Sequence, residues 1–320
     1  MGLRLIELDR VTSVAPLGLQ FHDAATGTIV GEGLSVWAFP AGRPAAKRQL
    51  VANRVGVYVL HHADGLIDLE HGAGDESYWQ NLPATKQFVI EVSDESSRFQ
   101  PFQLSIDLPT KDIYKWNGTS NSSPLPSMTS IPLYSSPARS LFGGMAVVRA
   151  ELHDPLRNGP LRAGAEGNAA ASVLELYDED LLVARGFADE LGRLALIFPY
   201  PSPRSFPPGS PPGSPLSSPP VATGPALTDQ IWNLKVRAFY SPPLSSPLDP
   251  FTEDSLPDLK STLAQPEAQL WADADRTETL SEVALQYGRE LILKSRSSSA
   301  SPLDESWESV LFITPAASPP

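Results

Sequence analysis

The residues best suited to metal chemistry are histidines that lie close together in one segment. His61, His62 and His71 are three of the chain's five histidines, and Glu70 stands next to the last of them. Imidazole and carboxylate groups are plausible zinc ligands. Neighbouring residues of a strand point to opposite faces, so His61 and His62 are poorly placed to bind one ion, and no His-Glu-x-x-His motif is present. We expect turn and surface histidines here, and no metal.

Motifs for hydrolysis and phosphate binding are also missing. None of the many serines stands in a Gly-x-Ser-x-Gly elbow. The glycines between Gly27 and Gly33 lack the Gly-Lys-Ser/Thr ending of a phosphate loop. The acids Asp178-Glu179-Asp180 separate two predicted strands, where we expect a solvated turn, with a calcium site as the alternative. The sequence therefore predicts a protein that is not an enzyme and uses no cofactor.

Candidate interface residues occur in one short segment that joins two predicted strands. Arg98, Phe99 and Phe102 surround Gln100-Pro101, and arginine and aromatic side chains dominate the energetics of protein interfaces. Phe206, inside a proline-rich stretch, is a fourth candidate. The alternative is a packed corner, with both rings of the first segment in the core and Arg98 paired with a carboxylate such as that of Asp94.

Tryptophans provide a second class of candidate surface. Trp37, Trp79 and Trp116 could form a platform on which sugars stack, as in a carbohydrate-binding or adhesin module. Core positions are the alternative for the same residues, because tryptophan is highly buried on average.

Composition limits the classes of partner. The chain has 320 residues, a net charge of −13, no cysteine and 33 prolines, about twice the usual share of proline. The negative charge argues against nucleic acid and anionic lipid as main partners. The first residues carry Glu7, Asp9 and Arg10 and do not resemble a secretory signal. No run approaches the roughly 20 apolar residues of a membrane helix, so we expect a cytoplasmic protein.

The positions of strands are predicted most clearly between Gly144 and Pro201. Apolar and polar residues alternate, which indicates strands with one buried face. The expected strands, separated by turn signals at Asp178-Glu179-Asp180 and Asp189-Glu190-Leu191-Gly192-Arg193, start near residues 145, 173, 182 and 194. Four short strands at this spacing predict an antiparallel β-sandwich.

This order of strands resembles a carboxypeptidase regulatory-like domain, a small transthyretin-like β-sandwich. The resemblance is carried by residues 145–150, 170–174 and 184–193. It implies that Asp189 and Gly192 shape the hairpin between the third and fourth strands. It implies no catalytic residues, because such domains are accessory scaffolds.

The rest of the chain predicts a second sandwich and long insertions. Residues 1–109 carry five or six short strands, including 3–9, 34–40, 55–60, 88–92 and 102–109, and residues 110–142 read as a linker. We expect residues 143–320 to form the regulatory-like domain with a disordered or extended insertion at 201–228, where nine of the first twenty residues are proline. A partly helical insertion is expected at 241–288, with helices at 258–271 and 279–287, and further strands at 231–240, 291–293 and 309–313.

The segments Arg98–Phe102 and Asp107–Pro109, followed by the regulatory-like domain, resemble baseplate-associated proteins of phage-tail-like contractile injection systems. The stretches 55–60 and 65–79 fit the same pattern. The resemblance implies a structural protein, present in several copies in a symmetric ring, that contacts other baseplate or tail proteins of the same particle. A carbohydrate- or surface-binding module is the alternative.

Overall fold

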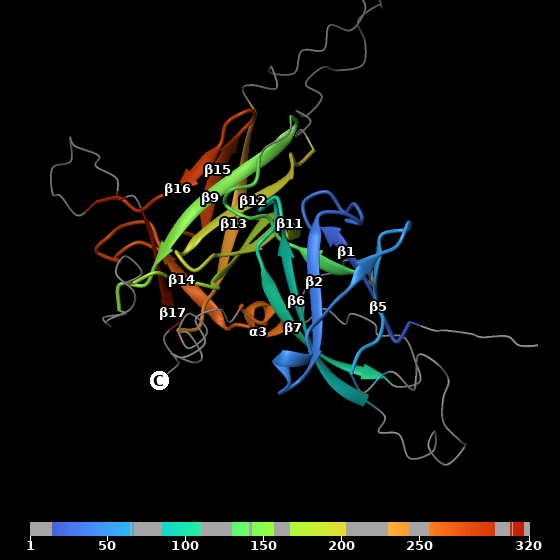
Figure 1. Cartoon of the computed structure of the whole chain (residues 1–320). Helices are drawn as coiled ribbons and strands as arrows, with labels where there is room; N and C mark the ends of the chain where they lie inside the picture. The colour runs from blue at the N-terminus through green and yellow to red at the C-terminus, as the bar shows by residue number, and fades with distance from the viewer. Residues whose placement is uncertain are drawn as a thin grey trace, which may run out of the picture. The chain divides into compact units, whose positions relative to one another are not determined.

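The computed structural model describes residues 15–64, 66, 85–109, 130–140, 143–156, 167–202, 230–242, 256–297, 308 and 310–316. Within these residues the fold is mainly β, as predicted, and α3 (Leu259–Leu263) and the 3-10 turn η1 (Pro44–Ala46) are short (Figure 1). The chain divides into two compact units. The first comprises residues 1–23, 27–133 and 253–264, and the second comprises residues 24–26, 134–252 and 265–320.

The first unit contains two four-stranded sheets. One has the order β4 (Val51–Ala52), β5 (Val57–Leu60), β1 (Leu17–Asp23) and β8 (Ile131–Leu133). The other has the order β3 (Arg48–Gln49), β2 (Leu34–Pro40), β6 (Thr85–Asp94) and β7 (Phe102–Pro109). Buried and half-buried residues alternate along β6 from Phe88 to Val92, as expected for a strand with one covered face.

Residues 48–52 connect these two sheets without a loop. The β3 half of the segment pairs with β2, and the β4 half pairs with β5. Leu50, which lies between the halves, is buried, and its amide donates to the carbonyl oxygen of Val36 at 2.8 Å. A strand that changes sheets in this way forms a corner of a sandwich.

The second unit contains one curled sheet. Its strands are β9 (Met145–His153), β10 (Val173–Asp178), β11 (Leu181–Phe187), β12 (Arg193–Pro199), β13 (Ile231–Phe239), β14 (Glu267–Trp271), β15 (Glu282–Gln286), β16 (Leu291–Leu293) and β17 (Leu311–Pro315). The order is β11-β10-β13-β14-β17-β9-β12, with β15 on β13 and β16 on β9. A Cβ on Gly186 of β11 would lie 2.8 Å from Leu196 of β12, so the two end strands approach each other. The core of the unit includes Trp232 and Tyr240.

Three strand pairs depart from the antiparallel pattern that we predicted. β1 with β8, β16 with β9, and β17 with β9 are parallel pairs, whereas the other pairs are antiparallel. Parallel partners need long connections, and in each case the paired strands are far apart in the sequence.

The insertion predicted at 241–288 is less helical than expected. The helix predicted at 279–287 is wrong, because β15 pairs with β13 there and buries Val283 and Leu285 on one side. The helix predicted at 258–271 is reduced to α3, and β14 follows after Pro266. Each segment is too short and too mixed for its own helix propensity to prevail over pairing with a sheet.

Part of the predicted linker is also built into the fold. Residues 131–133 form β8, in which Ile131 and Leu133 are buried. The residues that follow, Tyr134, Ser135, Ser136 and Arg139, are buried as well. The predicted strand at residues 3–9 and the insertion at 201–228, apart from Pro201 and Ser202, lie outside the described residues.

Candidate functional sites

The segment around Arg98 forms a tightly bonded corner. The carboxylate of Asp94 accepts three hydrogen bonds from Arg98. The donors are the Arg98 backbone amide at 2.5 Å, the Arg98 Nε at 3.1 Å and an Arg98 terminal guanidinium nitrogen at 2.7 Å. The guanidinium also donates to the carbonyl oxygen of Glu32 at 3.1 Å. The hydrogen bonds that the Arg98 guanidinium donates to Asp94 are the main reason that the pKa of Arg98 is raised. The arginine therefore holds the β6–β7 turn together.

The two phenylalanines of this segment face the interior. Phe99 is 4% exposed and Phe102 is 0% exposed. The guanidinium carbon of Arg98 lies 5.2 Å from the centre of the Phe99 ring. The structure thus has the packed corner that the sequence left as the alternative, and the rings offer no surface for a partner. Phe206 lies outside the described residues.

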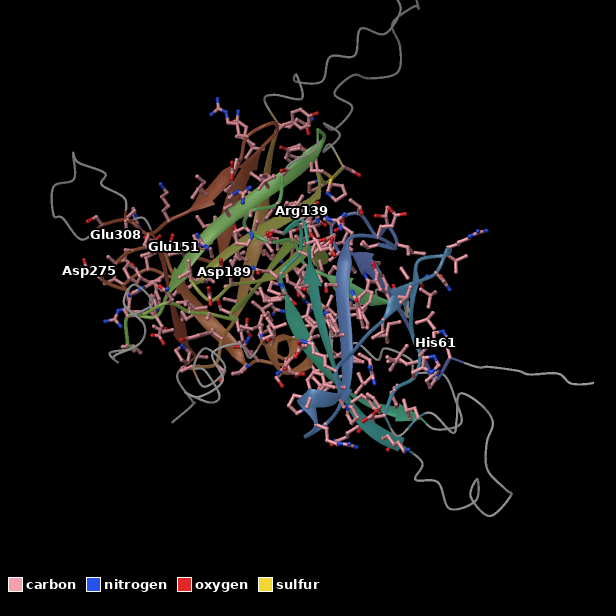
Figure 2. The ribbon with its side chains drawn as sticks, in the orientation of Figure 1. His61, Arg139, Glu151, Asp189, Asp275 and Glu308 are labelled. Atoms are coloured by element: carbon pink, nitrogen blue, oxygen red, sulfur yellow. The ribbon has the colours of Figure 1, made fainter. Side chains whose placement is uncertain are left out.

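The histidine segment shows no metal geometry in its described part. The rings of His61 and His62 are 6.2 Å apart, and His61 lies on the outside of the first unit (Figure 2). Among the described residues no three His, Asp or Glu side chains gather as a metal site would require. Glu70 and His71 lie outside the described residues.

A buried charge cluster that sequence reasoning missed lies on β10 and β11. Glu175 and Arg185 are directly paired across the strands, and the Arg185 Nε donates to the Glu175 Oε1 at 2.6 Å. The Tyr177 hydroxyl donates to the other carboxylate oxygen at 2.5 Å. Burial raises the pKa of Tyr134, which follows β8, although the neighbouring Arg185 opposes the shift. The sequence did contain a signal for this pair. Two predicted strands joined by a tight turn each carry a charged residue, and the charges are opposite.

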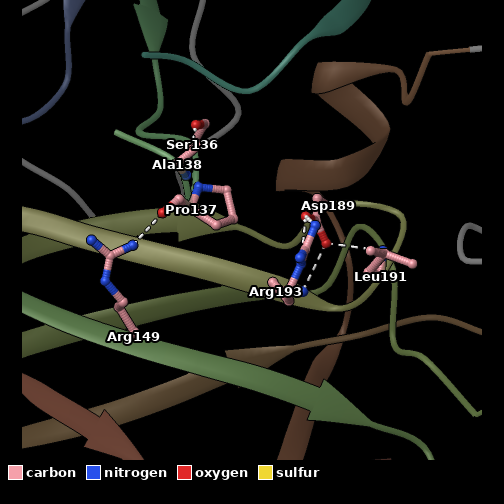
Figure 3. Close-up of polar contacts among 7 residues, drawn as sticks. All are labelled: Ser136, Pro137, Ala138, Arg149, Asp189, Leu191 and Arg193. Atoms are coloured by element: carbon pink, nitrogen blue, oxygen red, sulfur yellow. Dashed lines mark hydrogen bonds and ion pairs between the residues drawn. The ribbon is translucent and has the colours of Figure 1, made fainter. Parts of the chain in front are cut away.

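Asp189 fixes the hairpin between β11 and β12. Its Oδ1 accepts the amides of Leu191 at 2.9 Å and Arg193 at 2.8 Å, and its Oδ2 accepts the Arg193 guanidinium (Figure 3). Gly192 has a φ of +78°, and a Cβ there would lie 2.3 Å from the carbonyl oxygen of Leu152. Both residues therefore shape this hairpin, as the resemblance to a regulatory-like domain implied.

Arg149 ties the segment after β8 to the sheet of the second unit. Its guanidinium donates to the carbonyl oxygen of Pro137 (Figure 3). It also donates to the carboxylate of Glu290. The Ser136 hydroxyl in the same segment accepts the amide of Ala138 at 3.1 Å. The carboxylate of the buried Asp154 accepts a hydrogen bond from the Tyr240 hydroxyl at 2.9 Å. These contacts use charge to hold backbone and strands in place.

An open cavity of about 310 Å³ lies where β14 and β15 diverge from β13. Arg237 and Glu267 stand at its wall, and their charged groups are 3.7 Å apart. Apolar side chains such as Leu270 and Leu280 form the rest of the lining together with Gln269 and Thr279. The two charged groups thus form an ion pair at the wall of the cavity.

Aromatic rings gather at one end of the second unit. The Tyr200 ring lies 4.7 Å from that of Tyr287 and 5.4 Å from that of Trp232, and its hydroxyl accepts the amide of Gly288 at 2.8 Å. Trp37, which we considered for sugar stacking, instead has Lys47 over its ring at 5.4 Å. Trp79 and Trp116 lie outside the described residues.

Comparisons with known proteins identify no family. No family model matches the chain, and no curated protein matches it. Among solved structures, the Bacillus anthracis TIE protein aligns over 88% of this chain with 10% identity and a TM-score of 0.22. This alignment covers 33% of that protein. Among the described residues, no helix has the length and apolar character that crossing a membrane requires.

Proposed function

We propose that the chain is a structural protein that acts through protein–protein contacts and has no catalytic role. The observation that carries this proposal is the use of the buried charged groups that the structure describes. Glu175 and Arg185 pair with each other, and Asp154 holds Tyr240 and the amide of Leu156. Active sites instead keep such groups poised for a substrate. Charge used in this way supports a rigid scaffold.

The more specific proposal is a baseplate-associated component of a phage-tail-like contractile injection particle. It rests on the resemblance carried by residues 98–109 and by the strands after Met145. Rigid sheets suit this role, because their faces and edges can contact neighbours without rearranging. The chain would be present in several copies, next to other baseplate or tail proteins.

Sedimentation of native cell lysates tests this function. The chain is expected in the heavy fraction together with the other tail proteins, whereas the purified chain sediments as a monomer or weak oligomer. Recovery of the chain only at the top of the gradient, while the tail proteins sediment, would contradict the proposal.

A carbohydrate- or surface-binding module is the second candidate. The half-buried rings of Tyr200 and Tyr287, which pack against the buried Trp232, favour it, because aromatic faces are used to stack ligands. A glycan array separates the two functions. Binding of a defined glycan, lost in a Tyr287→Ala variant and retained in the exposed control Leu181→Ala, would favour the adhesin.

A further inference from the structure

The β4–β5 hairpin and the loop that packs on its turn carry exposed apolar side chains. Val55 is 70% exposed, Val51 is 67% exposed and Ile29 is 56% exposed. In the described part of the first unit, every large apolar side chain with such exposure belongs to this group. Isolated exposed aliphatic residues are ordinary, but a group of them marks an interaction surface. We call Ile29, Val51, Arg54 and Val55 the hairpin tip.

The backbone of the hairpin tip is rigidly preorganised. The Asn53 side-chain oxygen accepts the amides of Val55 and Val57, each at 3.0 Å. The Gly56 amide donates to the Asn53 carbonyl oxygen at 3.1 Å, and Gly56 has a φ of +79°. A Cβ on Gly31 would lie 2.9 Å from the Gly56 Cα, so the loop that carries Ile29 packs directly on the turn. A surface already in its bound conformation loses less entropy on binding.

Charge around the hairpin tip selects the kind of partner. Residues 33–63 contain Arg43, Lys47, Arg48 and Arg54 and no acidic residue, although the whole chain has a net charge of −13. Arg43 lies 3.6 Å from the carboxylate of Asp64, and Lys47 pairs with Glu91. Among the described residues, Arg48 and Arg54 have no charged partner.

We propose that the hairpin tip docks into an aliphatic groove bordered by carboxylates on a different protein. Val55 and Ile29 would fill the groove, and Arg54 would pair with its acidic rim. A second copy of this chain is a poorer match, because two chains of strongly negative charge repel each other. The inference rests on the proposed function only in that the partner is a protein.

Site-specific photocrosslinking in native cells tests the docking. A benzophenone amino acid replaces Val51, which leaves Val55 and Arg54 intact, and a matched probe replaces Leu181, which is 65% exposed in the second unit. We expect a crosslinked product from position 51 and none from position 181. Mass spectrometry should place the crosslink in a partner peptide that carries Asp or Glu beside aliphatic residues. Arg54→Glu and Val55→Ser should each lower the yield about tenfold, with unchanged thermal unfolding.

Other outcomes would overturn the inference. These are equal products from both positions, no product from position 51, a crosslink to a second copy of this chain, or a yield that Arg54→Glu leaves unchanged. The result is separate from the test of function. A chain that sediments with the particle but gives no product at position 51 retains the proposed function and loses this surface. A chain that is absent from the particle but gives the crosslinked product at position 51 retains this surface and loses the proposed function.

Discussion

A single carboxylate, that of Asp189, fixes one hairpin of the second unit through two backbone amides and an arginine. The Asp189→Ala variant loses all of these hydrogen bonds and should destabilise the protein by about 1–3 kcal/mol, because the amides of Leu191 and Arg193 are left without their acceptor. Chemical denaturation measures the loss. The neighbouring exposed Glu190→Ala should change stability by less than about 0.5 kcal/mol. Equal effects of the two variants would show that the Asp189 hydrogen bonds do not stabilise the hairpin.

His22 gives the first unit a pH dependence. Burial lowers the pKa of His22, against the opposing effects of Asp23 and of a hydrogen bond with the Ser130 backbone. The unfolded chain therefore binds a proton at a higher pH than the folded chain, so stability falls as the pH drops below about 6.5.

We expect the melting temperature of the wild type to fall between about pH 7.5 and about pH 5.5, and His22→Asn to reduce the fall. His153, whose pKa burial also lowers, should leave a residual slope in this variant. The exposed His61→Asn should follow the wild type. A His22→Asn profile that matches the wild type would contradict this account.

At the scale of elements, the β7 edge shows how a sheet is closed by a distant part of the chain. The Gln103 amide donates to the Pro257 carbonyl oxygen at 2.9 Å, and the Ser105 amide donates to the Asp258 carboxylate at 3.2 Å. Lys260 Nζ donates to the Ser105 carbonyl oxygen at 3.0 Å. Unpaired edges invite association with other strands, so α3 and the residues before it protect this one.

Removing this protection should have a measurable cost. Asp258 also caps α3 by accepting the Ser261 amide at 2.9 Å, so Asp258→Ala should lose about 1–2 kcal/mol of stability. Aggregation on heating should increase because the edge is uncovered. Asp107→Ala, at an exposed position of β7, is the matched control. If both variants aggregate alike, the edge is not what Asp258 protects.

The buried Glu175–Arg185 pair links β10 to β11. Arg185→Met leaves the carboxylate of Glu175 buried without its cation and should cost about 3–5 kcal/mol. Adding Glu175→Leu to that variant should restore much of the loss, which equilibrium unfolding of the double-mutant cycle measures. Arg296→Met, which breaks an exposed pair with Glu278, should cost about 0–1 kcal/mol. Equal losses at both sites would indicate that burial of the first pair has no energetic weight.

Strand positions could be predicted where one face of a strand is buried. β2 and β7 occupy the residues that the alternation indicated. β15 was missed because a strand at 279–287 depends on its pairing with β13, which no local pattern reveals. β8 was missed because Ile131–Leu133 is too short to show a period and is defined by its parallel pairing with β1.

The candidate site was less predictable than the fold. The sequence identified Arg98, Phe99 and Phe102 as a unit, but it could not decide between exposed and buried rings, because both roles favour aromatic residues. The hairpin tip was missed because Val55 was assigned to the strand at 55–60. The Asn53 hydrogen bonds and the positive φ of Gly56 place Val55 in the turn, with its side chain exposed. Asn-x-x-Gly before a strand was the available signal.

At the scale of the whole molecule, the proposal is a chain of two β units whose described buried charges hold strands together and whose exposed residues contact neighbours. Such a protein should fold and remain stable as an isolated chain. Several copies should assemble only when the partner proteins are present. The proposed particle supplies those partners, and the hairpin tip supplies one contact.

A cryo-electron microscopy map of the intact native particle tests the central claim most directly. The account predicts symmetry-related copies of this chain in or around the baseplate, with the sheets of both units recognisable and the hairpin tip seated against an acidic neighbour. A map in which other proteins account for all of the density, from cells that express this chain, would contradict it.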